Sequence, residues 1–425
     1  MNRRRMKPAA VVPALVLSLL AAPAQPLVFA QSTKAPNASP AVAPQLPLPA
    51  GPFGIGRFGF DWVDSSRPDR YASDAHAHRE LMVYLWYPTG QKTTPSAHGI
   101  YLPGARAMDA NPEIQAAQRD EFEAAWPAIV SGAVFSHAVD NAPPAKSPKR
   151  FPVIILSHGG FEYTALIEDL VSHGCVVATI EGAETARVVY FPDGRLVPAH
   201  HDAPQPGLSR DEQFKRMVAE ATAGITEGAA DVRFVLGRLM QLNDGQKPKF
   251  SLAGRLDLDQ VVAMGHSAGA AFAARACQLD LRFKACIDLD GAMMPVAALP
   301  DFGDAATLKQ PLLFLEAYYP ESRMFGTHEQ HEEFFRKKEA QFATCVAGSY
   351  DVTLHPSGFF HGSFSDYPLL VAANSAATDT ALHNLDLVEA FVRAFLDQTL
   401  TGKPQPLLDA PVAPTPDADV RPIGH

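Results

Sequence analysis

The sequence predicts an α/β protein whose core is a mostly parallel sheet covered by helices on both faces. Short apolar runs alternate with longer segments of helical periodicity, the pattern of a buried parallel sheet. One apolar run passes into a helical stretch through a glycine-bounded turn, Gly265-His266-Ser267-Ala268-Gly269. About 350 residues lie between Phe53 and the carboxyl tail, a length typical of one enlarged α/β domain.

The predicted strands are apolar runs bounded by turn residues. They cover residues 57–63, 81–87, 153–157, 175–180, 260–265, 283–289, 312–316 and 350–355. Two long segments between them, residues 214–239 and 385–395, keep one apolar face at helical spacing. Residues 103–150 and 189–209 are predicted to be lid-like insertions at the carboxyl edge of the sheet, where such folds build specificity.

The two ends of the chain have compositions unlike the rest. Residues 1–30 predict a secretory signal peptide, because a basic start precedes a short apolar run and small residues precede cleavage sites after Ala24 or Ala30. Residues 31–54 read as a linker rich in proline and alanine, residues 55–402 as the catalytic domain and residues 403–425 as a disordered tail. We therefore expect a secreted or periplasmic protein with no transmembrane span after signal removal.

Net charge and motif content exclude several function classes. The formal net charge is −10, and removing residues 1–30 takes four of the 36 basic residues and leaves 32 against 46 acidic ones, a net charge of −14. Such a protein is not expected to bind nucleic acid through bulk charge. No phosphate-binding glycine loop or dinucleotide motif is present, so no cofactor is predicted.

Metal binding and disulfide bonding receive little support from the residue pattern. His328 and His331 share one helical stretch, but no third ligand accompanies them, and a solvated charged helix is the prediction, with no metal site. Four cysteines, Cys175, Cys277, Cys286 and Cys345, are too few and too scattered for a disulfide framework. Each adjoins an apolar run, which favours buried thiols, although export would permit a bridge.

The segment Gly265 to Gly269 matches the G-x-S-x-G nucleophile elbow of the α/β-hydrolase fold. A strand that turns abruptly into a helix strains the serine backbone, so small neighbours are needed on either side. The turn exposes the Ser267 hydroxyl at the sheet edge, and the Ala268 amide becomes available to a developing oxyanion. The alternative is an ordinary strand-to-helix turn in which Ser267 only caps the helix.

A nucleophilic serine needs a histidine base and an acid that orients the histidine. His361, in a loop after the last predicted strand, is the candidate base, and His355 beside Pro356 is the rival. Asp290 and Glu316 each end a predicted strand and both lie between the serine and the histidine in the chain. Chain order alone therefore cannot choose the acid, but Gly291 gives Asp290 the sharper exit from its strand.

The remaining candidate residues flank these positions. A second oxyanion donor should come from the loop after the third strand, where Gly159 and Gly160 let the backbone approach a ligand closely, and we assign it to the Gly160 amide. A plain tight turn is the alternative. Apolar side chains beside the catalytic positions are predicted to line the substrate pocket, or else to belong to the core: Phe161, Met293, Met294, Phe359 and Phe360.

Several segments together resemble one enzyme family. Residues 151–160, 170–177, the elbow, 289–295 and 358–366 look like the plasma-type platelet-activating-factor acetylhydrolases, with bacterial lipases and polyester hydrolases as looser relatives. The resemblance spans roughly residues 55–400. It implies a Ser267-His361-Asp290 triad, with oxyanion donors at Gly160 and Ala268. The chain departs from the family at Ala270 after the elbow and at Gly182 after Glu181.

The expected function is hydrolysis of carboxylic esters with an apolar acyl part, through an acyl-enzyme. Acyl transfer, polyester or lipid hydrolysis and a non-catalytic binding role on the same scaffold are the alternatives. Apolar residues in the first insertion suggest a lid or lipid-facing surface containing Trp126, Ile129, Val130 and Phe135, and a helix packed on the domain is the alternative.

Overall fold

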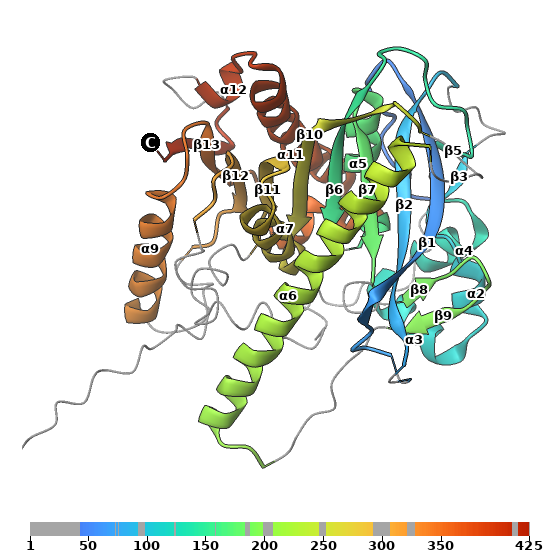
Figure 1. The fold of residues 1–425 in the computed structure, drawn as a ribbon, viewed down its shortest axis with the longest axis horizontal. Helices are drawn as coiled ribbons and strands as arrows, with labels where there is room; N and C mark the ends of the chain where they lie inside the picture. Colours follow the sequence, from blue (N-terminus) through green and yellow to red (C-terminus); the bar gives the residue numbers. More distant parts are fainter. Residues whose placement is uncertain are drawn as a thin grey trace, which may run out of the picture.

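A single large sheet organises the described part of the chain. The computed structural model describes residues 43–72, 74, 76–91, 98–122, 125–157, 159–182, 188–198, 207–245, 252–291, 307–320, 328–409 and 415–424. The sheet has ten strands in the order β14-β13-β12-β11-β10-β6-β7-β2-β1-β5 (Figure 1). Its middle is parallel, from β13 to β7, and antiparallel pairs flank it on both sides. This arrangement is an α/β-hydrolase fold.

Each predicted strand is present, with boundaries shifted by a few residues. The strands of the large sheet are β1 (Gly54–Pro68), β2 (His78–Thr89), β5 (Ala138–Asp140), β6 (Phe151–Ser157), β7 (Val176–Glu181), β10 (Leu256–His266), β11 (Phe283–Leu289), β12 (Leu312–Ala317), β13 (Ser349–Leu354) and β14 (Ala418–Ile423). The two predicted helical segments lie within α6 (Arg210–Asn243) and α11 (Ser375–Thr401).

Helices cover both faces because successive side chains of each strand point to opposite sides. In β6, Ile154 and Leu156 face the core shared with α11 and with α5 (Thr164–Ser172). Val153 and Ile155 face the other core, shared with α6 and with α7 (Ala268–Leu279). The sheet is therefore buried on both sides, and its carboxyl edge is where loops are free to build a site.

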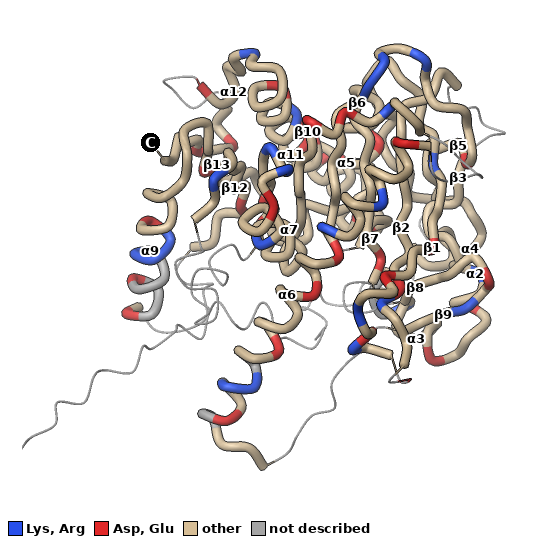
Figure 2. The backbone as a smooth tube through the Cα atoms, viewed as in Figure 1, with Lys and Arg blue, Asp and Glu red and all other residues tan. Residues whose placement is uncertain are grey.

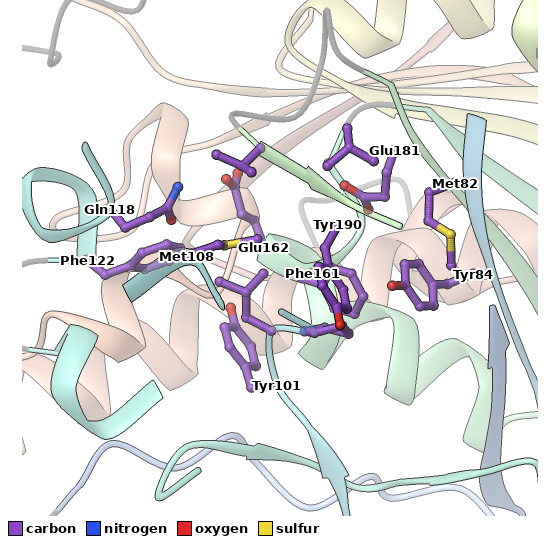
Figure 3. A pocket seen from close by; sticks show the side chains of 15 residues that line it. Met82, Tyr84, Tyr101, Met108, Gln118, Phe122, Phe161, Glu162, Glu181 and Tyr190 are labelled. Atoms are coloured by element: carbon purple, nitrogen blue, oxygen red, sulfur yellow. The ribbon is translucent and has the colours of Figure 1, made fainter. Parts of the chain in front are cut away.

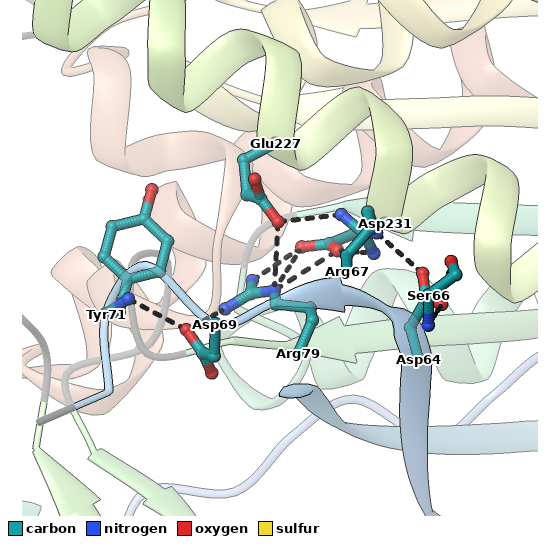
Figure 4. A network of polar contacts seen from close by, with 8 residues as sticks. All are labelled: Asp64, Ser66, Arg67, Asp69, Tyr71, Arg79, Glu227 and Asp231. Carbon is teal, nitrogen blue, oxygen red and sulfur yellow. Dashed lines mark hydrogen bonds and ion pairs between the residues drawn. The ribbon is translucent and has the colours of Figure 1, made fainter. Parts of the chain in front are cut away.

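A buried ionic network ties α6 to the antiparallel end of the sheet (Figure 4). Arg79 on β2, fully buried, donates to Asp231 on α6 at 2.6 Å. Arg67 at the end of β1 donates to the same carboxylate and to Glu227, one turn away on α6. The outer turns of α6 extend past the sheet and carry both acidic and basic residues (Figure 2).

The two predicted insertions are folded onto the domain. The first contains α2 (Ala105–Asp109), α3 (Pro112–Phe122), α4 (Trp126–Ser131) and β4 (Phe135–Ser136). It starts earlier than predicted, because β3 (Gly99–Ile100) pairs with β4 and belongs to the same unit. The second forms a hairpin of β8 (Val188–Tyr190) and β9 (Leu196–Pro198). The first insertion has its own apolar core, which includes Leu370 and Leu385 from the segment after the His361 loop.

The prediction that Trp126 faces lipid is wrong, because its side chain is buried. Trp126 is only 1 % exposed, stacks on Phe122 and donates its indole N–H to Asp109 at 2.9 Å. Ile129 is also buried, and Val130 and Phe135 are half-buried. The apolar run fills the interior of the insertion, so the packing alternative describes it.

The chain ends depart from the predicted domain limits. The predicted disordered tail contains α12 (Pro406–Asp409) and β14, which pairs antiparallel with β13 and buries Ala418 and Ile423. At the other end, part of the predicted linker contacts the domain: Leu46 is buried, and the Gly51 N–H donates to Ser172 Oγ at 3.0 Å. The predicted signal peptide lies outside the described residues.

The four cysteines are all unpaired and buried. Burial raises the pKa of the Cys175 thiol to about 12, which keeps this side chain protonated and inert at neutral pH. Within the described ranges, no helix is both long and apolar enough to cross a membrane.

Candidate active site

Ser267 stands at the tip of a strained turn between β10 and α7. Its backbone has φ 54° and ψ −124°, which few residues other than glycine adopt. Gly265 is required there because a Cβ at that position would lie 2.1 Å from the Gly269 carbonyl oxygen. The strain is held by packing and by a hydrogen bond from Ser267 N–H to the Leu289 carbonyl at 3.1 Å. These features match the predicted elbow.

Asp290 and His361 meet beside this turn. Asp290 follows β11 with φ 48°, and its Oδ2 lies 2.6 Å from His361 Nδ1 in the 3₁₀ turn η5 (His361–Phe364). A carboxylate only accepts, so Nδ1 carries the proton and Nε2 keeps its lone pair. Among the described residues no hydrogen bond joins Ser267 to His361, and such bonds often tighten only when substrate binds.

Further donors fix the Asp290 carboxylate. The Ala317 N–H donates to Oδ1 at 2.9 Å and the Tyr319 hydroxyl donates to Oδ2 at 2.5 Å. Burial and the nearby Asp290 charge raise the pKa of Tyr319, which keeps the hydroxyl a donor. These hydrogen bonds fix the direction of the carboxylate, as an orienting acid requires.

The rival residues lie elsewhere. Glu316 forms an ion pair with Lys338 on α9 (His328–Phe342) and accepts from Thr353 at 3.3 Å. Burial raises the pKa of Glu316 to about 7. His355 Nε2 lies 3.5 Å from Oδ2 of the exposed Asp419 on β14. Among the described residues, neither rival is hydrogen-bonded to His361, whereas Asp290 is.

His266, the residue before the serine, connects the catalytic loops. Its ring lies 4.3 Å from the His361 ring between centroids, and its Nε2 is 3.1 Å from the His361 carbonyl oxygen. Because that carbonyl only accepts, Nε2 carries the proton and Nδ1 accepts from the Tyr163 hydroxyl at 2.8 Å. His266 thus joins the His361 loop to η2 (Phe161–Tyr163). η2 directly follows Gly159 and Gly160, which we call the glycine loop.

The hydrogen bonds among His266, Asp290 and His361 occupy the atoms that could otherwise bind a metal ion. Ligand atoms of His266, Asp290 and His361 lie within 4.8 Å of one another. However, His361 Nδ1 and Asp290 Oδ2 are bonded to each other, and both ring nitrogens of His266 are used in hydrogen bonds. The atoms that would bind a cation already hold the acid–base pair in place.

Asp366 fastens the same loop to α5. Its carboxylate accepts from the Thr164 and Ala165 amides at 2.9 and 3.1 Å, and from the Tyr101 hydroxyl at 3.1 Å. Its own N–H donates to the Glu162 carbonyl at 2.7 Å. Burial raises the pKa of Asp366 well above its usual value. The His361 loop, the glycine loop and the first insertion therefore meet at one buried carboxyl group.

The two predicted oxyanion donors differ in their surroundings. Ala268 begins α7, and its amide belongs to the first turn, where amides lack helical partners. The Gly160 amide instead donates to Glu181 Oε1, at the end of β7, at 2.5 Å. A Cβ at Gly160 would lie 2.6 Å from that same oxygen, so only glycine fits this close approach.

A small cavity is lined in part by Gly159 and by Phe161, which follow β6 (Figure 3). Its volume is about 50 Å³, and its lining combines apolar side chains with the carboxyl groups of Glu162 and Glu181. Of the predicted pocket residues, Phe161 lines this cavity. Phe359 packs edge-on against Phe364 in the core, and Phe360 is half-buried. Met293 and Met294 lie outside the described residues.

Comparison with known proteins identifies the family. The family described as platelet-activating factor acetylhydrolase, isoform II, matches residues 41–376. This chain belongs to that family. A platelet-activating factor acetylhydrolase of Cavia porcellus is 25 % identical over 292 residues, which cover 64 % of this chain and 63 % of that protein. One of Canis lupus familiaris is 27 % identical over 44 % of each chain.

A solved structure extends the likeness over more of this acetylhydrolase-family chain. The ferulic acid esterase of Streptomyces cinnamoneus has 27 % sequence identity and a TM-score of 0.63, and the match covers 89 % of this chain and 99 % of that one. The curated relatives are matched over less than two thirds of their length. The resemblance seen in the sequence motifs is thus confirmed at the level of family and fold.

Four residues that shape the site have no role assigned by the motifs. His266 occupies the variable position of the elbow, Tyr163 follows the glycine loop, Tyr319 follows Glu316, and Asp366 ends the His361 segment. A polar side chain next to a motif residue was the only signal available for any of them. Their contacts join segments distant in sequence, which residue order does not reveal.

Proposed function

We propose that this chain is a serine hydrolase of carboxylic esters. The observation that carries the proposal is the Asp290–His361 hydrogen bond beside a serine held at φ 54°. The relatives named as acetylhydrolases and the neighbour named as a ferulic acid esterase are all ester-cleaving enzymes by name, which supports the same reaction class.

In the proposed mechanism, His361 Nε2 takes the proton of Ser267 as Oγ attacks the ester carbonyl. Asp290 stabilises the imidazolium that forms, through the 2.6 Å hydrogen bond to Nδ1. The Ala268 amide, with Gly160 as the second donor, binds the oxyanion. His361 then gives its proton to the leaving alcohol, and water repeats the sequence on the acyl-enzyme.

The substrate class we propose is an ester with an apolar acyl part. Support comes from Phe161 beside the glycine loop, whose side chain packs against Tyr84 and lines the cavity. Lipid or polyester esters are included in this class. Export also stays a prediction from the sequence, since residues 1–42 are not described.

The test is a comparison of variants on p-nitrophenyl esters of graded acyl length. Ser267→Ala and Asp290→Asn should each lose at least three orders of magnitude in kcat, because the first removes the nucleophile and the second favours the wrong histidine tautomer. Glu316→Gln is the matched control, a half-buried carboxyl group near the end of the neighbouring strand, and should keep most of the activity.

Circular dichroism should be unchanged in all three variants. A folded Ser267→Ala protein with more than a tenth of the parent activity would contradict the proposal and favour a non-catalytic scaffold. Loss of activity in Glu316→Gln with retention in Asp290→Asn would move the acid to β12.

A further inference from the structure

The amide proposed as the second oxyanion donor is already occupied by a carboxyl group. Gly160 N–H donates to Glu181 Oε1 at 2.5 Å, and Glu181 is 7 % exposed. A hydrogen bond to an ionised carboxylate is roughly twice as strong as one to a neutral acceptor. The ionised side chain therefore competes directly with any oxyanion for this donor.

Within the part of the chain that the structure describes, Glu181 has no basic partner. The charged side chain that acts on it is a second carboxylate, Glu162 of η2, which repels the ionised form. The cavity beside it is also lined by three tyrosines, Tyr84 of β2, Tyr101 and Tyr190 of β8. The Arg57 guanidinium of β1 lies over the Phe161 ring, 5.8 Å from its centroid, and donates to the Asp140 carboxylate at 2.8 Å.

A buried carboxylate without a cation is costly, and such groups occur most often where a function uses them. Burial, and then the charge of Glu162, raise the pKa of Glu181 to about 7, although the Gly160 hydrogen bond opposes this. At neutral pH the group is therefore near the midpoint between its two forms.

We propose that Glu181 is a positioning residue of the oxyanion hole, which is competent only when Glu181 is protonated and releases the Gly160 amide. This inference rests on the proposed esterase function. As a carboxylate, Glu181 holds the amide proton and places a negative charge next to the developing oxyanion. As a carboxylic acid it is a weaker acceptor, so the amide can turn to the substrate oxygen.

The sign of the pH effect follows from these two forms. Above the pKa of Glu181, the competent form declines roughly tenfold for each pH unit. We therefore expect kcat/KM to fall by at least tenfold between pH 7 and pH 9, since loss of one oxyanion donor costs about 10² to 10³ in rate.

The experiment is the pH profile of kcat and KM for Glu181→Gln against the parent enzyme. The amide side chain has a similar shape and cannot ionise, so the fall above pH 7 should disappear and activity at pH 9 should rise relative to the parent. The effect should appear in kcat with KM changed less than twofold, because the oxyanion forms after binding.

Glu162→Gln is the matched control, since it lines the same cavity but its carboxyl group does not contact the Gly160 amide. It should keep the fall and move it to lower pH, because one repulsive charge next to Glu181 is lost. A parent enzyme with no fall between pH 7 and 9, or a Glu181→Gln profile with the same fall, would overturn the proposal.

A second measurement needs no substitution at Glu181. Phosphylation of Ser267 by diethyl p-nitrophenyl phosphate passes through the same oxyanion site, so its rate constant in the parent enzyme should fall over the same pH range. A rate constant that stays level to pH 9 would count against the proposal. If Ser267→Ala retained activity, the esterase proposal itself would fail, whereas an inactive Ser267→Ala with an unchanged Glu181→Gln profile would reject Glu181 alone.

Discussion

At the scale of single residues, the Asp290 carboxylate is held by three hydrogen bonds. It accepts from the Ala317 amide, the Tyr319 hydroxyl and the His361 imidazole. Two of these donors come from the end of β12 and the residues just after it. The strand that carries the rival acid Glu316 thus supplies the donors that hold Asp290.

Removing one of these donors should weaken catalysis without unfolding the protein. We expect Tyr319→Phe to lower kcat about tenfold, because a hydrogen bond to a charged group is worth about 1.5–3 kcal/mol and Asp290 would hold His361 less firmly. Stability should change little, since the Tyr319 side chain is 41 % exposed. Steady-state kinetics at fixed pH would measure the effect.

Tyr318→Phe is the control for this prediction, because its side chain is more exposed and its backbone amide, not its hydroxyl, bonds to Leu354. Equal losses in the two variants would show that the hydroxyl bond to Asp290 has no special role.

At the residue scale, a short contiguous motif is predictable from the sequence, whereas the direction of a side chain is not. Ser267 could be placed because the elbow constrains a short contiguous segment, and Gly265 is there for a steric reason that the motif contains. The choice between Asp290 and Glu316 depends on which way each side chain points from its strand end, and residue order is silent on that. The glycines predict a close approach to the backbone at Gly160, but the carboxyl group that bonds this amide comes from a different strand.

At the scale of elements, β14 closes the sheet beside β13. It pairs with all six residues of β13 and places Ile423 in the core with α6 and α7. The composition of residues 403–425 predicts disorder because prolines and aspartates dominate the average. A six-residue strand is stabilised by its neighbour rather than by its own propensity, so a composition average conceals it.

Truncating the inward side chain of β14 should destabilise the fold. We expect Ile423→Ala to lower the free energy of unfolding by about 2 kcal/mol, since it removes buried apolar surface and leaves a cavity. Urea unfolding followed by circular dichroism would measure this value.

Asp419→Ala, on the exposed side of the same strand, should change the free energy of unfolding by less than about 0.5 kcal/mol. If Ile423→Ala were equally neutral, the strand would contribute nothing to global stability.

At the scale of the whole molecule, α6 links the parallel and antiparallel parts of the sheet. Its apolar face packs on the sheet, and Asp231 bonds both Arg67 and the fully buried Arg79 (Figure 4). The periodicity of this helix predicted its apolar face. The ionic network was not predictable, because its members come from β1, β2 and α6.

Breaking this network should cost more than breaking a surface ion pair. Asp231→Ala leaves Arg79 buried without its main partner, and we expect a loss of about 3–5 kcal/mol in the free energy of unfolding. Activity of the folded fraction should be unchanged, because the network is separate from the Ser267 site. Chemical denaturation and kcat measured on the same sample would test both statements.

The control lies on the same helix. Glu220→Ala removes an ion pair with Arg216 one turn away, which should be worth about 0.3–0.5 kcal/mol. A comparable loss in both variants would mean that burial of Arg79 carries no special cost.

The core of the first insertion has a practical consequence for protein engineering. Because Leu370 and Leu385 pack inside that core, and Tyr101 bonds to Asp366, the insertion and the segment from the His361 loop into α11 form one interlocking unit. A chimera that takes residues 99–140 from a relative should therefore also take residues 361–385. Exchange of either segment alone would put two surfaces together that were never selected to fit.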